Sequence, residues 1–307
     1  MTLPFIAADE FTELMPIAAA VDVLESAFAT LETDGPARSH VVTSDGDLLL
    51  MPATSTDGVG VKLVTVTPDN AAHDLPLIHG VYVMFAAGTQ EPMAVIDGGA
   101  MTALRTAAVS GLATRHLARD DSTRLVVFGA GTQARSHVAA MCAVRPIEQV
   151  TVVSRTQATA QSLVDELTTS GIDATVGDAL AIADADVICT CTTSDEPVVA
   201  GGQLPDGVHL NAVGAYRPDT RELDTTTMQR GRIVVEQRAA ALDEAGDLCI
   251  PIADGDLTAA DIIADLAQIV AGHQVRRTTD DITVFKSVGL AIEDLAIAVA
   301  AVARRGS

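Results

Sequence analysis

The chain is poor in aromatic and in basic residues. Its 307 residues include no Trp, two Tyr and six Phe, so aromatic residues make up 3% of the sequence. Lys62 and Lys286 are the only lysines, and the 19 basic residues face 41 Asp and Glu, which gives a net charge of −22. This charge argues against nucleic acid or an anionic membrane as a partner, because both are polyanions. An anionic substrate would need cations in its own site.

Long apolar runs are also missing. No apolar segment reaches the length of a membrane span without a charge or a breaker. The first residues, MTLPFIAADEF, have neither the basic start nor the apolar core of a signal peptide. The four cysteines form no CxxC pair, and we interpret them as small core residues in a reducing compartment, with no metal site. We therefore expect a globular, cytoplasmic enzyme.

The first part of the chain has the pattern of a small sheet with helices. Apolar residues at helical spacing predict a helix from Pro16 to Asp34. Strand-like runs separated by turn residues follow at 41–43, 48–51, 59–66, 78–85 and 95–99. They predict an antiparallel or mixed sheet. A second helical pattern covers 101–117, and the polar break Arg119–Ser122 predicts a domain boundary.

The second part alternates strands with helices. Predicted strands lie at 125–128, 150–153, 173–175, 187–190, 209–212 and 233–235. Such alternation is typical of a parallel sheet with helices on both faces. After Glu236 we expect mostly helix, including an Ala-rich helix within 284–302. The fold class is thus α/β with two domains.

A glycine turn opens the second part. The sequence GAGTQA, Gly129–Ala134, follows an apolar strand and precedes a helical segment. This arrangement can place backbone N–H groups and a helix N-terminus against a pyrophosphate. Gly129 would allow the tight turn, Gly131 the approach of the phosphates, and Ala134 the packing of the helix on the strand. A glycine-rich turn without a ligand is the alternative, but the strand–turn–helix context favours nucleotide binding.

The end of the second strand bears on which dinucleotide would bind. An NAD site usually has an acidic residue there, which bonds the ribose 2′-hydroxyl. Here the strand ends in Ser154, Arg155 and Thr156, and Arg155 offers a cation where a 2′-phosphate would lie. The alternative is that Arg155 only solvates a loop. The sequence favours NADP(H) and leaves NAD(H) possible.

Three isolated cations stand out in the acidic first part: Arg38, Lys62 and Arg105. Lys62 alternates with valines in a strand, and such a lysine usually faces solvent. Arg105 lies in a mostly apolar helix, where an arginine needs an anionic partner. Together they could hold a substrate carboxylate, with arginine as the bidentate group and lysine as a point charge or proton donor. Their spacing does not show whether they converge.

Several motifs together resemble the ornithine cyclodeaminase/mu-crystallin family over nearly the whole length. They are Pro36–Arg38, Leu50–Ala53 with Lys62 ten residues after Pro52, Leu75–Pro76, Leu104–Ala108, Gly129–Ala134, Asn211–Asp219, Arg221–Asp224 and Phe285–Gly289. The resemblance implies a Rossmann-fold NAD(P)-binding domain at 119–289 and a smaller α/β substrate-binding and dimerisation domain at 1–118 and 290–307. It also implies a homodimer.

The resemblance implies roles for individual residues. Arg38, Lys62 and Arg105 would hold the substrate carboxylate, with Tyr216 beside the substrate. The dinucleotide would lie along Arg105, Gly129, Ala130, Gly131, Thr132, Gln133, Ser154, Arg155, Thr156, Thr192, Val213, Gly214 and Ser287. Lys62, Asp219 and Tyr216 are candidates for handling the proton, and His40 and His79 are weaker ones because a satisfied histidine is the ordinary case.

Departures from the cyclodeaminase pattern narrow the expected chemistry. In that group Leu49 would be a glutamate, Tyr216 an aspartate, and Ser154 an aspartate. Losing these carboxylates argues against an ornithine cyclodeaminase. The run Arg217–Leu223 instead resembles the ketimine reductase side, which reduces cyclic imino acids such as pyrroline-2-carboxylate or piperideine-2-carboxylate to proline or pipecolate. Alternatives are an alanine dehydrogenase, an ornithine cyclodeaminase, and a non-catalytic NADPH-dependent ligand-binding protein.

Overall fold

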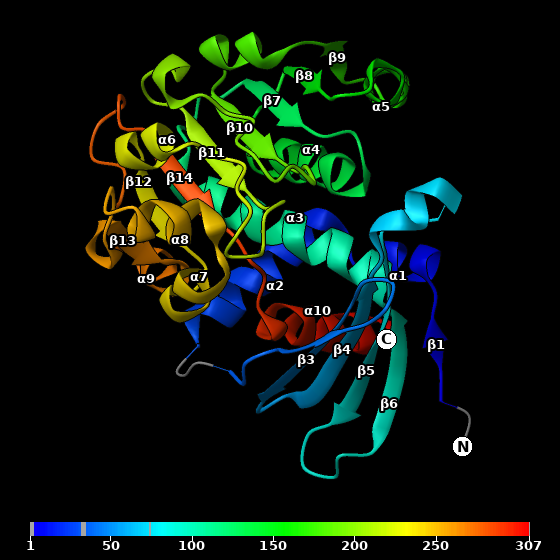
Figure 1. Ribbon diagram of the computed structural model, residues 1–307. Coiled ribbons are helices and arrows are strands. Elements are labelled where there is room, and N and C mark those ends of the chain that lie inside the picture. Colours follow the sequence, from blue (N-terminus) through cyan, green and yellow to red (C-terminus); the bar gives the residue numbers. More distant parts are fainter. Residues whose placement is uncertain (1–2, 32–34, 74, 307) are drawn as a thin grey trace. The chain divides into compact units, whose positions relative to one another are not determined.

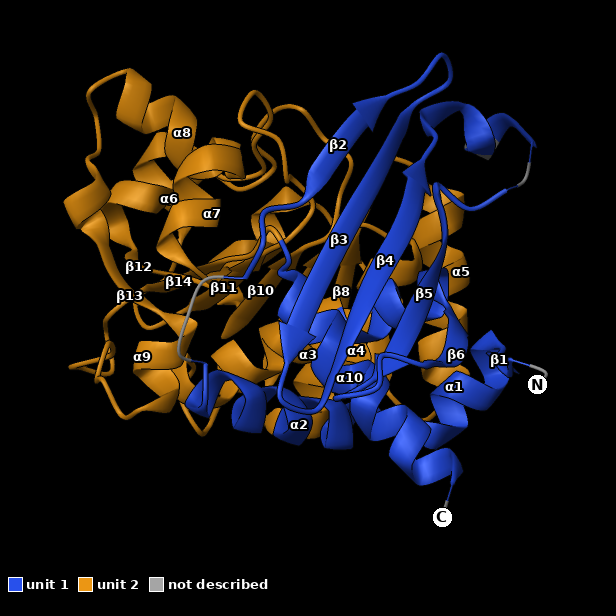
Figure 2. Cartoon of the chain, turned by 90° about the horizontal axis from the view of Figure 1, so that it is seen from below, with its two compact units in different colours: residues 1–105, 289–307 blue, residues 106–288 orange. Residues whose placement is uncertain are grey.

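The computed structural model describes residues 3–31, 35–73 and 75–306, and the chain forms two compact units (Figure 1; Figure 2). The first unit consists of residues 1–105 and 289–307, and the second of residues 106–288. The elements of the first unit are β1 (Phe5–Ile6), α1 (Ala8–Leu14), α2 (Ile17–Ala29), β2 (Ser39–Val42), β3 (Asp47–Ser55), β4 (Gly58–Val66), a 3₁₀ turn (Pro68–His73), β5 (Ile78–Ala86), β6 (Pro92–Asp97), the start of α3 (Gly98–Leu117), and α10 (Ala291–Arg305).

The first unit is built on a six-stranded sheet in the order β1-β6-β5-β4-β3-β2. All neighbouring strands are antiparallel except β1 and β6, so the expected mixed sheet is confirmed. Alternation along β4 separates its two faces, since Lys62 and Val64 are buried while Val61 and Leu63 are half-buried. Helix α10 packs across β3, β4 and β5 and against α2 on the buried side (Figure 2). The sheet therefore has one helix-covered face and one that is only partly covered.

The second unit contains an eight-stranded sheet in which every pairing is parallel. Its elements are β7 (Arg124–Phe128), α4 (Thr132–Val144), β8 (Gln149–Val153), α5 (Gln157–Thr169), β9 (Asp173–Val176), β10 (Val187–Thr190), β11 (His209–Ala212), α6 (Thr225–Arg230), β12 (Arg232–Val235), α7 (Arg238–Glu244), α8 (Gly246–Ala253), β13 (Ile262–Asp265), α9 (Leu266–Val270) and β14 (Thr283–Lys286), with short 3₁₀ turns at Ala179–Asp184, Gly201–Gln203 and Ala259–Asp261. The six predicted strands of this part are all present.

The strand order places a reversal at β7. The sheet runs β13-β12-β14-β11-β10-β7-β8-β9. Numbered among themselves, the strands β9-β8-β7-β10-β11-β14 have the order 3-2-1-4-5-6, which is that of dinucleotide-binding folds. In such sheets ligands bind outside the carboxyl ends of the strands, where the order reverses. The glycine turn after β7 lies at that point.

Two strands of this sheet were not predicted. Residues 237–307 were expected to be mostly helical, but β13 and β14 are strands, and α10 begins only at Ala291. Both strands are four residues long, and all four residues of β14 are buried, including Lys286. A short segment buried on both faces, as β14 is, shows no alternation, so its pattern cannot be distinguished from that of a buried helix.

The boundary between the compact units also differs from the expected one. The units change at 105/106 and 288/289, whereas the sequence placed the changes at 118/119 and 289/290. The polar residues 119–122 follow α3, but α3 is one continuous helix whose first residues belong to the first unit and whose remainder belongs to the second. A polar break marks the end of a helix, which here is not where the units divide.

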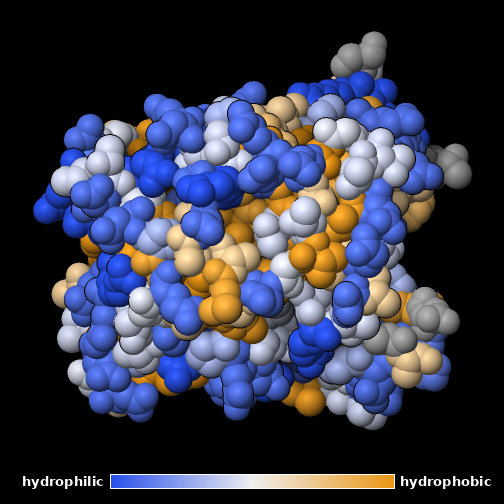
Figure 3. Space-filling view, turned by 90° about the horizontal axis from the view of Figure 1, so that it is seen from above, coloured by the Kyte–Doolittle hydropathy of each residue, from blue (hydrophilic) through white to orange (hydrophobic). Residues whose placement is uncertain are grey.

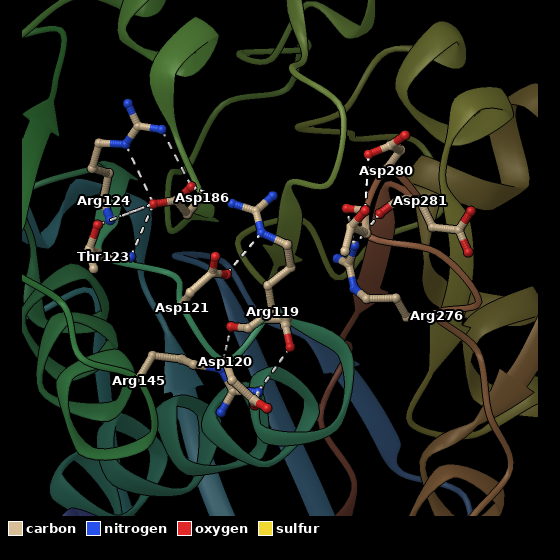
Figure 4. Close-up of polar contacts among 12 residues, drawn as sticks. Arg119, Asp120, Asp121, Thr123, Arg124, Arg145, Asp186, Arg276, Asp280 and Asp281 are labelled. Carbon is tan, nitrogen blue, oxygen red and sulfur yellow. Dashed lines mark hydrogen bonds and ion pairs between the residues drawn. The ribbon is translucent and has the colours of Figure 1, made fainter.

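Arginines near the end of α3 serve the fold. The Arg145 guanidinium donates hydrogen bonds to the carbonyl groups of Arg115 and Ala118, at 2.8 and 3.0 Å, and Arg276 donates to Leu117 at 2.7 Å. Figure 4 shows the neighbouring Asp186, which accepts hydrogen bonds from the side chains of Arg119 and Arg124. These cations satisfy helix carbonyls and a buried carboxylate. They are therefore not available as an anion-binding surface.

One face of the molecule is largely hydrophilic (Figure 3). Figure 3 shows one face on which hydrophilic side chains predominate, with smaller apolar areas between them. Among the described residues, no helix is long and apolar enough to cross a membrane.

Candidate functional site

Lys62 lies on the helix-covered face of the first unit's sheet. Its side chain is 1% exposed, and its Nζ donates a hydrogen bond of 2.9 Å to Oδ1 of Asp294. The composition-based expectation that a lysine among valines faces solvent does not hold here. Burial and the nearby Arg105 lower the pKa of Lys62 to about 8, while Asp294 opposes them. Lys62 is therefore a buried ammonium group poised to lose its proton near neutral pH.

Arg105 lies on the first unit's part of α3. Like Lys62, it is paired with acidic side chains of α10. Its Nη1 lies 3.1 Å from Oε2 of Glu293, and its Nε lies 3.3 Å from Oδ1 of Asp294. Gly289 lies against the guanidinium, where a Cβ atom would collide with it, and has a φ of +79°. A glycine is thus required at this position on both steric and conformational grounds.

Arg38 reaches the same place from the segment before β2. It is half-buried, and its Nη2 donates a hydrogen bond of 2.5 Å to the carbonyl oxygen of Gly289. The structure thus brings Arg38, Lys62 and Arg105 together around Gly289 and the first turn of α10. Three cations converge in a chain of net charge −22, which is the arrangement that a carboxylate ligand requires.

Sequence reasoning missed the acidic partners of these cations. Glu293 and Asp294 are both fully buried near the start of α10. Tyr82, opposite Lys62 in the β4–β5 pairing, was missed as well. Its hydroxyl is buried and has no hydrogen-bond partner among the described residues, and burial together with Asp294 raises its pKa. Two adjacent acids in an otherwise apolar helical pattern were the signal that could have identified this pair.

The two weaker histidine candidates lie in ordinary surroundings. His40 is 47% exposed and its Nε2 lies 2.6 Å from Oδ1 of Asp47, while His79 is exposed. Leu49, where a cyclodeaminase would have a glutamate, belongs to an apolar cluster with Met51 and Val64. Neither histidine is buried in a site, and the position of Leu49 is apolar where a cyclodeaminase would have a carboxylate.

The glycine turn of the second unit has the geometry that a pyrophosphate needs. Gly129 has a φ of +108°, and a Cβ there would lie 2.5 Å from the carbonyl oxygen of Cys191. Gly131 has open space around it, and Ala134 is fully buried. Helix α4 begins without a side-chain cap, so its first-turn N–H groups suit an anionic ligand. Ala130 is half-buried, Thr132 is exposed and Gln133 is half-buried in this turn.

The end of β8 carries the residues expected to select the dinucleotide. Ser154 is half-buried, with its Oγ 3.3 Å from Oγ1 of Thr159. Arg155 and Thr156 are exposed. No ion pair or side-chain hydrogen bond involves Arg155 within the described ranges, in contrast to the paired Arg135 of α4. The Arg155 guanidinium can therefore take a ligand without giving up a protein partner.

Glu222 ties together the loops that follow β10 and β11. It is fully buried and accepts hydrogen bonds from Oγ1 of Thr192 at 2.7 Å and from the N–H of Gly214 at 2.6 Å. Burial raises the pKa of Glu222, while Lys286 opposes this effect. Val213, between these groups, donates its N–H to the carbonyl of Thr190. Two expected cofactor-lining residues, Thr192 and Gly214, are thus fixed by one carboxylate that sequence reasoning did not identify.

The loop after β14 is fixed in a similar way. Ser287 donates from its Oγ to Oε1 of Glu236 at 2.6 Å, and the N–H of Val288 donates to the other oxygen of that carboxylate at 3.0 Å. Lys286 is buried, and its Nζ lies 2.8 Å from Oδ2 of Asp247. Buried carboxylates therefore hold the carboxyl ends of β10, β11 and β14.

The candidates Tyr216 and Asp219 lie in the loop between β11 and α6. Tyr216 is half-buried. Asp219 is exposed and forms a bidentate pair with Arg217, at 3.1 and 2.8 Å. The hydrogen bond from Arg217 lowers the pKa of Asp219 below its ordinary value. Asp219 is thus a carboxylate at neutral pH, which makes it a poorer proton donor than Lys62.

The glycine turn, the strand order and the uncapped start of α4 define a dinucleotide-binding α/β protein. The ornithine cyclodeaminase/mu-crystallin family matches residues 5–304, and the chain belongs to this family, which confirms the resemblance. Among curated proteins, Delta(1)-pyrroline-2-carboxylate reductase of Bacillus cereus is 38% identical over 282 residues, which cover 88% of this chain and 86% of the relative.

Solved structures agree with this placement. Delta(1)-pyrroline-2-carboxylate reductase of Thermococcus litoralis, in complex with NADH and L-proline, is 34% identical, with a TM-score of 0.95 and coverage of 98% of this chain and 97% of that one. An archaeal alanine dehydrogenase dimer with bound NAD is 30% identical, with a TM-score of 0.93 and coverage of 99% and 96%. The α/β fold class with a dinucleotide-binding domain is thereby confirmed.

Proposed function

We propose that this protein reduces a small cyclic 2-imino acid, pyrroline-2-carboxylate or piperideine-2-carboxylate, to the L-amino acid with NAD(P)H. The observation that carries the proposal is the convergence of Arg38, Lys62 and Arg105 at the start of α10. The Bacillus cereus relative bears the name of such a reductase, and the Thermococcus litoralis neighbour holds NADH and L-proline, the product of reducing the five-membered ring.

In this proposal the two arginines bind and orient the substrate carboxylate. Arg105 is fixed by Glu293 and Asp294, and Arg38 by the Gly289 carbonyl, so neither guanidinium has to be ordered when the substrate binds. The cofactor supplies the hydride that reduces the C=N carbon. The protein must then orient the ring and manage one proton at the imine nitrogen. Lys62 is the better candidate for that proton, because Asp219 is held as a carboxylate by Arg217.

We propose NADP(H) as the preferred cofactor. The pyrophosphate would lie on Gly129–Gln133, and a 2′-phosphate would accept from Ser154, Arg155 and Thr156. Support comes from the absence of a carboxylate at the end of β8 and from the exposed Arg155, which pairs with no described acid. The neighbours carry NADH or NAD, so NAD(H) is the alternative cofactor.

Alanine dehydrogenase, the reductive amination of pyruvate, is the second candidate. The archaeal alanine dehydrogenase neighbour favours it, and the same cations would bind pyruvate. Ornithine cyclodeamination is disfavoured because Leu49 and Tyr216 replace the carboxylates expected beside a substrate amine. Leu49 lies in an apolar cluster, where a charge would be costly.

We further propose a homodimer formed through the open face of the first unit's sheet. Leu48, Leu63 and Val81 line a shallow hollow there, and Leu50 and Val83 are also half-buried. An apolar face of this kind is typical of an interface. The neighbouring alanine dehydrogenase is a dimer.

The four free cysteines fit a reducing compartment, and we propose the cytoplasm.

A spectrophotometric panel tests the function. Loss of NADPH and of NADH is followed with pyrroline-2-carboxylate, with piperideine-2-carboxylate, and with pyruvate plus ammonia, and NAD with ornithine serves as the cyclodeaminase control. Reduction of a cyclic imine without ammonia supports the proposal. Strict dependence on ammonia would identify an alanine dehydrogenase, and conversion of ornithine to proline would overturn the interpretation of Leu49 and Tyr216. Dinucleotide binding without any turnover would indicate a ligand-binding protein.

A further inference from the structure

One carboxylate oxygen stands between the two buried cations of the first unit. Oδ1 of Asp294 accepts the hydrogen bond from Nζ of Lys62 at 2.9 Å and lies 3.3 Å from Nε of Arg105. The Asp294 side chain is 0% exposed, and those of Lys62 and Arg105 are 1% and 8% exposed. Little solvent surrounds these charges, so their interactions are stronger than those of surface pairs.

Helix α10 supplies a second acid to the same cluster. Glu293 and Asp294 are consecutive, so their side chains leave the helix about 100° apart and reach Arg105 from two directions. Glu293 takes Nη1 and Asp294 takes Nε, which leaves the guanidinium little freedom to rotate. The hydrogen bond from Lys62 goes to Asp294. Asp294 thus contacts both cations, and Glu293 adds a second contact to Arg105.

Four ionisable groups surround Lys62. Arg105 approaches from α3, Glu293 and Asp294 from α10, and Tyr82 from β5, directly across the sheet. Gly60, two residues before Lys62, leaves the space that the Tyr82 hydroxyl fills, because a Cβ there would collide with it. The hydroxyl carries no charge at neutral pH, since burial raises its pKa. Arg105 therefore disfavours an ammonium group at Lys62, and the two acids favour it.

We propose that Asp294 is the positioning residue that keeps the Lys62 side chain charged and aimed, so that Lys62 can give its proton to the imine nitrogen. This inference rests on the proposed function. The balance of the step is simple: the imine nitrogen takes a proton from the Lys62 ammonium, the adjacent carbon takes a hydride from NAD(P)H, and the C=N double bond becomes a CH–NH single bond. Lys62 is left as a neutral amine and regains its proton from solvent.

The charge of Lys62 can be measured directly, because the chain has only two lysines. Protein grown with [¹³Cε]lysine gives NMR signals from Lys62 and Lys286 only, and Lys62→Arg, which keeps a cation beside Asp294, assigns them. We expect the Lys62 signal to titrate near pH 8 in the wild type. In Asp294→Asn it should titrate at least about one pH unit lower, because an opposite charge at this distance shifts a pKa by about 1–3 units. Asp294→Glu should restore most of the shift.

Controls separate the charge of Asp294 from its packing. Tyr82→Phe changes a neutral group next to Lys62 and should leave the titration in place, and the Lys286 signal should not move in any Asp294 variant. An unchanged Lys62 titration in Asp294→Asn overturns the inference. Should Asp294→Asn fail to fold, the wild type still decides, because a Lys62 that titrates below about pH 6 is not kept charged at neutral pH.

Kinetics then tests whether the charge matters to the reaction. If Lys62 must be protonated, kcat/KM for the cyclic imine falls on the alkaline side through the pKa of Lys62. In Asp294→Asn this alkaline limb should move to lower pH, with about a fivefold loss at pH 8 for a shift of one unit. A merely structural role would lower kcat/KM at all pH values alike and leave the limb in place. A wild type with no imine reduction would refute the proposed function, while the NMR titration would still judge Asp294.

Discussion

Nζ of Lys286 lies 2.8 Å from Oδ2 of Asp247, and both side chains are fully buried. The other oxygen of Asp247 accepts hydrogen bonds from the N–H groups of Glu222 and Leu223, each at 2.8 Å. Lys286 also donates to the carbonyl of Ala215 at 2.5 Å. This pair therefore connects the end of β14 with the segment that carries Glu222, whose carboxylate fixes Thr192 and Gly214.

Replacing Lys286 by Met should destabilise the protein strongly. It leaves the buried Asp247 charge without its cation, which typically costs about 3–5 kcal/mol. Arg305→Met is the matched control, because it removes an ion pair of 2.6 Å with Glu10 in which both side chains are more than a third exposed. Such a pair contributes at most about 1 kcal/mol. Urea unfolding measures both, and equal losses would contradict the importance of the buried pair.

The two glycines of the turn should separate folding from cofactor binding. Gly129→Ala introduces a side chain at a φ of +108° and against the Cys191 carbonyl, so both stability and dinucleotide affinity should fall. Gly131→Ala meets no protein atom within 4 Å. It should keep the stability and weaken the dinucleotide at least about tenfold, by about 1.4 kcal/mol. Gly202→Ala, also in open space, is the control. Calorimetric binding that is unchanged in Gly131→Ala would refute the pyrophosphate assignment.

Arg155 and Ser154 should set the cofactor preference. A charge-assisted hydrogen bond contributes about 1.5–3 kcal/mol, so Arg155→Ala should lower kcat/KM for NADPH by about 10- to 100-fold and affect NADH much less. Ser154→Asp should reverse the preference, because a carboxylate repels a 2′-phosphate and accepts from a 2′-hydroxyl. Arg277→Ala, an exposed arginine in the loop before β14, controls for the loss of a surface charge. If the ratio of kcat/KM for NADPH to kcat/KM for NADH does not change in Arg155→Ala, Arg155 does not select NADP(H).

The sequence predicted the parts whose pattern is local. The glycine turn, the six strands before Glu236 and the five strands β2 to β6 of the first unit each have a period or a turn signal, and all are present, whereas the two-residue β1 was not expected. β14 was missed because its four residues are buried on both faces. Glu222 and Asp247 were missed because they accept from the backbone N–H groups of Thr192 and Glu222, which lie far from them along the chain, and no spacing reveals such contacts.

The cluster of Arg38, Lys62 and Arg105 illustrates the same limit. Arg38, Lys62 and Arg105 were identified as candidates because cations are rare in the first part, and family motifs strengthened the choice. Their convergence depends on Gly289 and on Glu293 and Asp294, which come from the other end of the chain. Charge pairing across such a distance in sequence is a property of the fold.

Removing either cation of this cluster should affect the substrate and spare the cofactor. Lys62→Ala or Arg105→Ala should raise KM for the imino acid by about 10- to 100-fold, because each charge-assisted hydrogen bond to a carboxylate contributes about 1.5–3 kcal/mol. Lys62→Ala should also lower kcat, because it removes the proposed proton donor. Dinucleotide affinity, measured by calorimetry, should remain at the wild-type value in Lys62→Ala. His40→Ala, which removes an exposed pair with Asp47, is the matched control and should have wild-type kinetics. Near-wild-type KM values in both Lys62→Ala and Arg105→Ala would refute the role of these cations in binding the substrate carboxylate.

Acid should destabilise the second unit through His137. This histidine is fully buried, with Nδ1 2.8 Å from the Gln133 carbonyl and Nε2 3.0 Å from Oγ of Ser110. Burial lowers its pKa from 6.5 to about 4. Between these values the unfolded chain binds a proton that the folded chain does not, so this contribution to stability is present above pH 6.5 and is lost as the pH falls towards 4.

The expected loss is about 3 kcal/mol at pH 4 relative to pH 7, since each pKa unit corresponds to about 1.4 kcal/mol. His137→Gln cannot titrate, so its stability should fall less steeply over this range, although the variant starts from a lower value at pH 7. His79→Gln, the same change at an exposed position, should follow the wild type. Unfolding free energies at half-unit steps of pH provide the comparison. Parallel curves for wild type and His137→Gln would show that His137 does not carry this part of the acid sensitivity.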